Sequence, residues 1–295
     1  MTAPPPGVEA DAPLARLTTI GTGGPARFLA RPESPAELEH VLGWAAAEGI
    51  AVAVIGLGSN LLVADAGYDG LALQLGGDLA AIEIDGLTVR CGGGASLAAV
   101  VRRCTEAALT GIEFGCAIPG TVGGAVRMNA GAYGSEIRDV LRSAELVSAS
   151  GTRSGGPSEL ELSYRHSNVR PSEVVAEAVL QLEPGVRDEV RARVRELQQR
   201  RSDSQPRKAR TFGSVFKNPD EGLGAGALIE ACGLKARTIG GARISSVHAN
   251  FIENAGGASS ADVAALVSLA RACVRERFEV DLQHEVELLG PVSLD

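Results

Sequence analysis

The sequence predicts an α+β fold, because its short strands and helices do not alternate regularly as in a doubly wound sheet. Two helices have clear signals. Ser34-Pro35-Ala36-Glu37 combines an N-cap, a first-turn proline and a capping-box glutamate, and Gly49 ends the helix after Glu48. Apolar residues recur every three or four positions over 262–278, which predicts a helix with one core-facing side. Further helices are expected from Leu97 after the cap Ser96, over 187–201, and near 228–232.

The strands are expected at short apolar runs between these helices. The last run, 280–289, alternates strictly between apolar and polar residues, as a half-buried strand does, with His284 as the single interruption on the apolar side. The predicted strands are Ala51–Ile55, Leu71–Leu75, Ile82–Ile84, Leu87–Cys91, Ala144–Ala149, Val174–Leu182 and Val280–Leu289.

Composition excludes several classes of protein. The chain has 295 residues and a formal charge of −8, which argues against a nucleic-acid binder with its dominant basic surface. The five cysteines are scattered without a C-x-x-C pair, so neither a disulfide framework nor a metal site is expected. The longest apolar run, around 50–57, is too short to cross a bilayer, and no signal peptide precedes it. We therefore expect a cytoplasmic protein without membrane contact.

Four segments are expected along the chain. Residues 1–14, rich in proline and alanine, resemble a disordered tail. The polar, basic stretch from Arg200 to Arg210 contains Pro206 and is the best candidate for an interdomain linker. This gives a cofactor domain over 15–200, a smaller α+β domain over 201–278, and a C-terminal strand over 279–295.

Three glycine-rich loops lie in the first half of the chain. Gly56-Leu57-Gly58-Ser59-Asn60-Leu61 begins like a dinucleotide-binding fingerprint, but Leu61 stands where the third glycine must be. The loops at 118–125 and 129–134 match neither that fingerprint nor the P-loop. Each loop alone is most simply a tight turn, whereas three together favour backbone N–H groups that bind a pyrophosphate.

These loops, and the segment from Thr19 to Ala26, are similar to segments of the UDP-N-acetylenolpyruvoylglucosamine reductase family. They occur in the family's order and with its approximate spacing. The resemblance implies a split FAD-binding domain of the vanillyl-alcohol-oxidase/PCMH type and a smaller α+β substrate-binding domain. It implies FAD bound noncovalently, since no histidine lies near the loops, and NADPH as reductant. The residues that it places at the cofactor are Gly56, Gly58, Ser59, Asn60, Leu61, Pro119, Gly120, Thr121, Gly123, Gly124, Ala125, Asn129, Gly131 and Tyr133.

Three further segments resemble the catalytic motifs of that family, in which an arginine, a serine and a glutamate act. By this resemblance the corresponding residues here are Arg165, Ser214 and Glu285. In the family's reaction a hydride is added to an enolpyruvyl ether, and negative charge spreads into its carboxylate. Arg165 would stabilise that charge and Ser214 would give the proton. Glu285 can donate only when protonated, which requires a pKa raised by burial. The resemblance implies contact with the UDP-sugar enolpyruvyl substrate by Tyr164, Lys217, Asn218, His248 and Asn250.

The interval from Tyr164 to Gly213 is short, as in the family's compact subtype, and a monomer is expected. The chain departs from the family's pattern at Ser204, at Phe212 and at Gln283-His284. Two alternatives therefore stay open: an FAD oxidoreductase of the same fold with another substrate, and a non-catalytic protein that binds nucleotide sugars. Singly, each catalytic candidate is also an ordinary surface or turn residue. Their occurrence together with three cofactor loops favours the enzyme.

Overall fold

The computed structural model describes residues 2–206 and 209–294, which divide into two compact units. Unit 1 comprises residues 1–10, 28–57 and 70–201, and unit 2 comprises residues 11–27, 58–69 and 202–295. The chain therefore passes between the units several times, within strands β1 (Glu9–Pro13), β2 (Pro25–Ala30) and β5 (Tyr68–Leu73) among other places. The predicted boundary at 200/201 is close to the last crossing, but the prediction missed that 11–27 and 58–69 belong with the C-terminal part.

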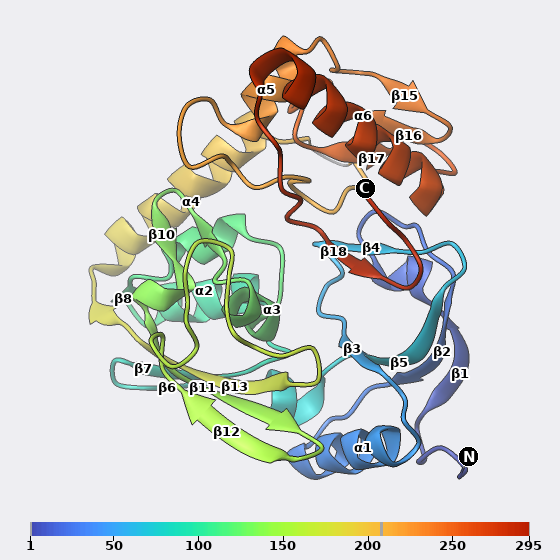
Figure 1. Ribbon diagram of the computed structural model, residues 1–295. Coiled ribbons are helices and arrows are strands. Elements are labelled where there is room, and N and C mark those ends of the chain that lie inside the picture. Colours follow the sequence, from blue (N-terminus) through green and yellow to red (C-terminus); the bar gives the residue numbers. More distant parts are fainter. Residues whose placement is uncertain (1, 207–208, 295) are drawn as a thin grey trace. The chain divides into compact units, whose positions relative to one another are not determined.

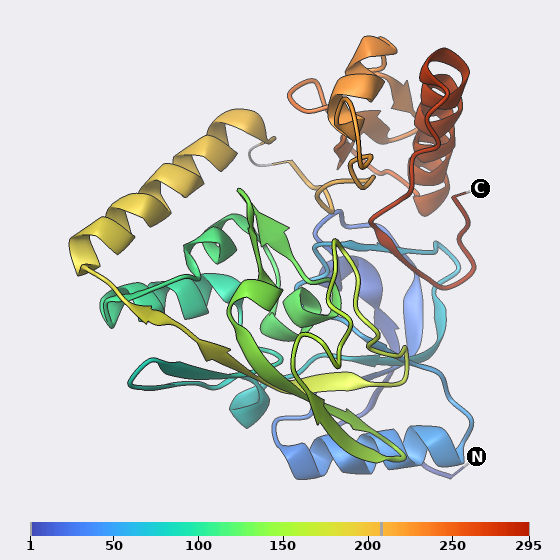
Figure 2. The same cartoon turned by 60° about the vertical axis from the view of Figure 1, so that its left-hand side comes forward.

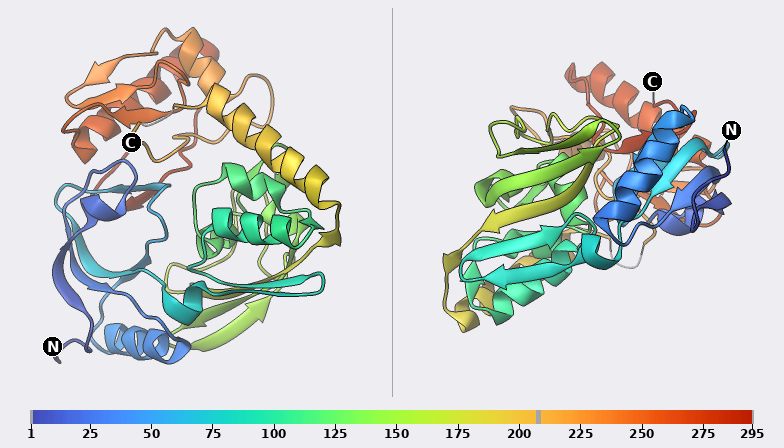
Figure 3. Two further views of the ribbon diagram at one scale, coloured as in Figure 1. Left: turned by 180° about the vertical axis from the view of Figure 1, so that it is seen from behind. Right: turned by 90° about the horizontal axis from the view of Figure 1, so that it is seen from below.

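Unit 1 is built around a five-stranded sheet with the strand order β12-β11-β13-β7-β6, antiparallel throughout. Helices α2 and α3 lie on one face of this sheet (Figures 1 and 3). Its elements are β6 (Ile82–Asp85), β7 (Thr88–Gly92), β11 (Leu141–Ser148), β12 (Gly151–Gly155), β13 (Val174–Gln181), α2 (Leu97–Glu106) and α3 (Val122–Arg127).

Strand β13 is buried on both faces because apolar residues point alternately into two cores. Val175, Ala178 and Leu180 join the core beneath α2, and Val174 and Ala176 join the core beneath α1 (Pro35–Ala47). Helix α1 begins as predicted, with Ser34 accepting the Glu37 N–H at 3.3 Å. Its core also takes residues from β3 (Val52–Val54) and β5, which pair in parallel.

Unit 1 also contains a short hairpin, a second pair of short strands and one long helix. The hairpin of β9 (Gly131–Ala132) and β10 (Ser135–Glu136) carries the third glycine-rich loop. Strands β8 (Leu109–Thr110) and β14 (Glu183–Pro184) pair just before α4 (Arg187–Ser204), the long helix that stands out in Figure 2. The predicted linker is therefore partly helical up to Ser204, and its residues 207 and 208 lie outside the described residues.

Unit 2 packs α5 (Ala225–Ala231) and α6 (Ser260–Phe278) around one core with a three-stranded sheet (Figure 1). The sheet consists of β15 (Thr238–Ile239), β16 (Ala242–Ile244) and β17 (Ile252–Asn254). The predicted stripe of α6 is confirmed, since Val263, Leu266 and Val267 are fully buried. Ser259 and Asp262 form its capping box.

Two terminal predictions were wrong. Residues 1–14 are not a disordered tail: Thr2 bonds Glu48, β1 forms a strand, and Ala12 and Leu14 are buried. The predicted strand 280–289 is a strand only in β18 (Glu287–Leu289), which pairs in parallel with β4 (Leu61–Val63). Alternation identified the core-facing side chains correctly, but only three residues have a partner strand.

Candidate active site

The first two glycine-rich loops meet inside unit 1. A Cβ placed on Gly56 would lie 2.6 Å from the Thr121 hydroxyl oxygen, so the two loops are in van der Waals contact only because residue 56 is glycine. Thr121 is buried, and its hydroxyl caps α3 by accepting the Gly124 N–H at 3.4 Å. The sequence predicted both loops but gave no reason to place them side by side.

Backbone donors collect where these loops meet. The N–H groups of Gly56, Leu57, Gly120 and Thr121 bond no described residue, and the first three residues are not buried. Successive unpaired N–H groups of this kind form a concave anion site, which suits a pyrophosphate. Other predicted cofactor residues in α3 are used internally: Gly123 donates to the Gly93 carbonyl at 2.8 Å, and Ala125 packs in the core. Pro119 is exposed at the loop tip.

The third loop supports the turn that carries Arg165. Ser163 and His166 exchange backbone hydrogen bonds of 3.2 and 3.0 Å, which leaves Tyr164 and Arg165 at the tip of a two-residue turn. Arg165 has a φ of +51°, a left-handed conformation that costs about 1–3 kcal/mol for a non-glycine residue. Its guanidinium lies 5.1 Å from the Tyr164 ring centroid and donates to the Gly131 carbonyl at 2.8 Å.

Two predicted cofactor residues in that loop differ in exposure. Tyr133 is 40% exposed and left-handed, at φ +56°, so its ring is available to a ligand. Asn129 is fully buried, and its amide bonds the Ser163 carbonyl and the Arg138 N–H, both at 2.9 Å. Both ends of the Asn129 amide bond protein groups, and its contact with the cofactor stays a prediction.

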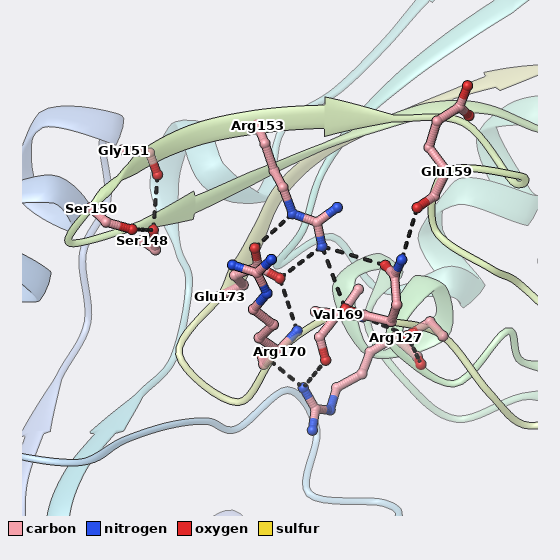
Figure 4. A network of polar contacts seen from close by, with 11 residues as sticks. Arg127, Ser148, Ser150, Gly151, Arg153, Glu159, Val169, Arg170 and Glu173 are labelled. Carbon is pink, nitrogen blue, oxygen red and sulfur yellow. Dashed lines mark hydrogen bonds and ion pairs between the residues drawn. The ribbon is translucent and has the colours of Figure 1, made fainter.

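A polar network secures the rest of the segment between β12 and β13, as Figure 4 shows. Arg153 donates twice to the Glu173 carboxylate, at 2.6 and 2.8 Å, and Glu173 also accepts the Arg170 N–H at 2.8 Å. Arg127, the last residue of α3, donates to the Val169 carbonyl at 3.3 Å. The helix that follows the second glycine loop is thus tied to the segment that carries Arg165. No sequence pattern pointed to this network.

Glu173 is expected to stabilise the fold in a pH-dependent way. The two Arg153 hydrogen bonds are the main cause that lowers the pKa of the Glu173 carboxyl, which is 5% exposed, from 4.5 to about 2. A lowered folded-state pKa stabilises the protein above the unfolded pKa, and this stabilisation is lost as pH falls from about 4.5 to 2. Glu173→Gln should therefore cost about 3 kcal/mol near neutral pH and less in acid.

Denaturant unfolding at several pH values measures this effect. Glu196→Gln is the matched control, because Glu196 pairs with arginines on the exposed face of α4 and such pairs stabilise little. A stability difference between Glu173→Gln and the unchanged protein that stays constant down to acid pH contradicts the prediction.

Unit 2 brings Ser214 and Glu285 to neighbouring backbone segments. The segment 214–217 runs between two others: Ser214 bridges Phe251, and Phe216 bridges His284. The Glu285 N–H donates to the Val215 carbonyl at 2.7 Å, directly beside Ser214. Both residues are half-buried, and the Ser214 hydroxyl bonds no described residue. Arg165 belongs to unit 1.

The predicted substrate residues of unit 2 differ in how far their side chains already contact the protein. Lys217 is half-buried and its ammonium group has no hydrogen bond or ion pair with the described residues, so it is available to an anion. Asn218 accepts the Ala225 N–H at the start of α5, at 3.1 Å. His248 packs edge-on against Phe251, and burial lowers its pKa. The Asn250 side chain is buried and bonds only the backbone of Phe216, and its contact with substrate stays a prediction.

The remaining predicted cofactor residues lie at the start of β4 in unit 2. Gly58 has a φ of +61°, and a Cβ there would lie 2.0 Å from the Leu17 carbonyl oxygen, so glycine is required. Ser59 and Asn60 are half-buried, and Leu61 is the first residue of β4. Asn60 donates from its side chain to the Glu285 carbonyl at 3.0 Å. The sequence gave no sign of this link between Asn60 and Glu285.

Comparisons with known proteins cover most of the chain. Residues 205–289 match the model of the UDP-N-acetylenolpyruvoylglucosamine reductase C-terminal domain, and residues 26–154 match an FAD binding domain. The UDP-N-acetylenolpyruvoylglucosamine reductase of Anaeromyxobacter dehalogenans is 44% identical, over 97% of this chain and 86% of its own length. The one from Bacillus subtilis is 40% identical, over 96% of this chain and 94% of its own.

The chain belongs to the UDP-N-acetylenolpyruvoylglucosamine reductase family. The crystal structure of the Thermus caldophilus reductase superposes with a TM-score of 0.83 at 35% identity, covering 96% of this chain and 98% of that one. The predicted family and the α+β fold with its FAD-binding domain are confirmed.

FAD is the cofactor of this family member, and the geometry of unit 1 fits it. The unpaired N–H groups at Gly56 and Gly120–Thr121 are suited to its pyrophosphate, and the partly exposed ring of Tyr133 lies in the neighbouring loop. No group of three or more metal-ligating side chains occurs in the described ranges 2–206 and 209–294. In those ranges, no helix has the length and apolar character needed to span a bilayer.

Gly56→Ala should weaken FAD binding about tenfold or more, equivalent to about 1.4 kcal/mol. The added methyl group would meet the buried, helix-capping Thr121 side chain and push the two loops apart. The flavin-to-protein absorbance ratio and a fluorescence titration with FAD measure the loss. Gly43→Ala is the control, because a Cβ there meets nothing within 4 Å in the middle of α1. Equal flavin content in both variants contradicts the prediction.

Proposed function

We propose that this chain reduces UDP-N-acetylglucosamine enolpyruvate to UDP-N-acetylmuramate with NADPH, in peptidoglycan precursor synthesis. The activity is that of the family, whose members it matches over almost their whole length. One observation carries the assignment of the site: Ser214, with a hydroxyl that bonds no described residue, lies beside the segment of Glu285 in unit 2. The backbone segments that carry a proton donor and a carboxyl group are thereby held side by side.

FAD, when bound, supplies the hydride that it has received from NADPH. The chain's own residues then manage charge and proton. As the enolpyruvyl group becomes anionic, the planar guanidinium of Arg165 binds its carboxylate, and electrostatic stabilisation of this kind is typically the largest catalytic contribution. The bond to Gly131 fixes the guanidinium in place beforehand.

Ser214 gives its hydroxyl proton to the carbon next to the carboxylate, a general-acid step worth about 10² to 10⁴ in rate. Glu285 acts on the same carboxylate, as a protonated donor or by orienting one. Its segment is fixed on both sides, by the Val215 carbonyl and by the Asn60 amide.

The substrate's diphosphate requires cations or N–H donors. Lys217, three residues after Ser214, is a half-buried cation without a described partner, and we assign it to this group. Tyr164 is 46% exposed at the Arg165 turn and is assigned to the sugar nucleotide. His248 remains a candidate contact, with its Nδ1 accepting the Asn250 N–H at 3.2 Å.

Phe212, one of the departures from the family's pattern, does not favour a different substrate. Its side chain is 1% exposed and packs in the core of unit 2, which supports a role in the fold and not in substrate choice. We also propose that the protein is cytoplasmic and monomeric. Light scattering of the purified chain tests the monomeric state.

A steady-state assay tests the proposed activity. Flavin-loaded protein, NADPH and the enolpyruvyl sugar nucleotide are combined, and the NADPH absorbance and the product mass are followed. The expected result is NADPH consumption that requires the sugar nucleotide, together with a product heavier by the mass of two hydrogens. Consumption that is independent of the sugar nucleotide, or none at all, rejects the substrate. Binding of the sugar nucleotide without turnover would support the non-catalytic alternative.

A further inference from the structure

Each segment that carries a proposed catalytic residue is held by one asparagine amide. Near Ser214, the buried Asn250 side chain accepts the Phe216 N–H at 3.0 Å and donates to the Phe216 carbonyl at 2.8 Å. The Asn250 carbonyl accepts the Val215 N–H at 2.9 Å. One residue thus fixes the two positions that follow Ser214.

Near Glu285, the bond is to the catalytic residue itself. The Asn60 amide donates to the Glu285 carbonyl at 3.0 Å, and the Asn60 carbonyl accepts the Glu287 N–H at 3.0 Å. Asn60 immediately precedes β4, the strand that pairs with β18. The glutamate is therefore held just before the point where the parallel pairing begins.

Near Arg165, the asparagine holds the base of the turn. The fully buried Asn129 amide donates to the Ser163 carbonyl and accepts the Arg138 N–H, both at 2.9 Å. Ser163 closes the turn with His166, and Arg165 at its tip is left-handed. A strained conformation persists only where its surroundings determine it strongly, and this amide is part of those surroundings.

We propose that Asn60, Asn129 and Asn250 are positioning residues, each of which sets the main chain beside one of the groups that act on the substrate. An asparagine amide suits this task, because it offers a donor and an acceptor in the arrangement of a peptide group and bonds main chain as another strand would. Misplacing a catalytic group by about 1 Å can cost roughly a hundredfold in rate. The proposal rests on the proposed function, since it assumes that Arg165, Ser214 and Glu285 act on the substrate.

The test compares Asn250→Asp with a matched control, Asn254→Asp. Both substitutions keep the acceptor bonds to backbone N–H groups and lose one donor bond, to Phe216 and to Ile20 respectively. Flavin reduction by NADPH and flavin reoxidation by the enolpyruvyl sugar nucleotide are measured separately without oxygen. Asn250→Asp should reduce at the unchanged rate and reoxidise roughly tenfold to a hundredfold more slowly. The solvent deuterium isotope effect on reoxidation should increase, because proton transfer from Ser214 becomes limiting.

Asn254→Asp should lower stability without changing either half-reaction. If Asn250→Asp does not fold, the test uses Asn60→Ala instead, because Asn60 is only half-buried. The same slow reoxidation is expected in this variant when it is saturated with FAD. Reoxidation at the unchanged rate in the folded asparagine variant overturns the proposal. Ser214→Ala, measured in the same way, separates the positioning role of the asparagines from the proposed role of Ser214. If Ser214→Ala also reoxidises at the normal rate, the proposed role of Ser214 fails. If only Ser214→Ala is slow, the positioning inference alone fails.

Discussion

Ser214→Ala is expected to stop product formation while NADPH still reduces the flavin. The hydroxyl is the assigned proton donor, and removal of a general acid costs about 10² to 10⁴ in rate. The fold should tolerate the change, since the hydroxyl holds no described residue and the segment is fixed by backbone bonds. The rate of flavin reoxidation by substrate is the measurement.

Ser246→Ala provides the control for that experiment. Ser246 is also a serine of unit 2, but it is exposed in the loop before His248 and bonds no described residue. Its variant should behave as the unchanged protein in both half-reactions. If Ser214→Ala forms product at the unchanged rate, another group gives the proton.

Arg165→Lys is expected to lower kcat/KM about 10² to 10³-fold, mainly through kcat. Lysine keeps the charge but loses the planar fork that can bond Gly131 and a carboxylate at the same time. Steady-state kinetics with varied sugar nucleotide measure this effect.

Arg102→Lys, on the exposed surface of α2, is the control and should change neither parameter. A rise in KM with unchanged kcat in Arg165→Lys contradicts the account. It would mean that the arginine binds the substrate equally in the ground and transition states.

Much of the fold was predictable because its signals are local. The caps at Ser34 and Ser96 and the stripe of α6 depend on residues close in sequence, and all three are confirmed. Pairing between distant strands has no such signal. Nothing in Leu61–Val63 indicates that it pairs with β18, and so the sequence did not predict that residues 58–69 belong with the C-terminal unit.

The candidate site was likewise predictable only in part. Motif order predicted the loops of Gly56 and Thr121 and the segments of Arg165 and Ser214, but not what each side chain bonds. Asn129 and Asn250 stand inside the motifs and were predicted to bind ligands, whereas the structure uses their amides to bond backbone. A motif records that a residue type is needed at a position. Whether the partner is a ligand or a distant peptide group is decided by tertiary structure.

Arg165 shows a further limit of the sequence. A two-residue turn with a left-handed second position favours glycine, so local propensity argues against arginine there. The conformation is held by the Ser163–His166 bonds, by Asn129 and by the Gly131 carbonyl, which come from separate segments. Strain at a residue with a proposed catalytic role is what a functional constraint produces.

On the proposed function, this chain passes reducing equivalents from NADPH through FAD to an enolpyruvyl sugar nucleotide. The most direct test is an anaerobic cycle followed by visible absorption. NADPH should bleach the flavin spectrum of the purified protein, and the enolpyruvyl sugar nucleotide should restore it fully without oxygen. A flavin that remains bleached after that addition, or a purified protein that shows no flavin spectrum, would contradict the account.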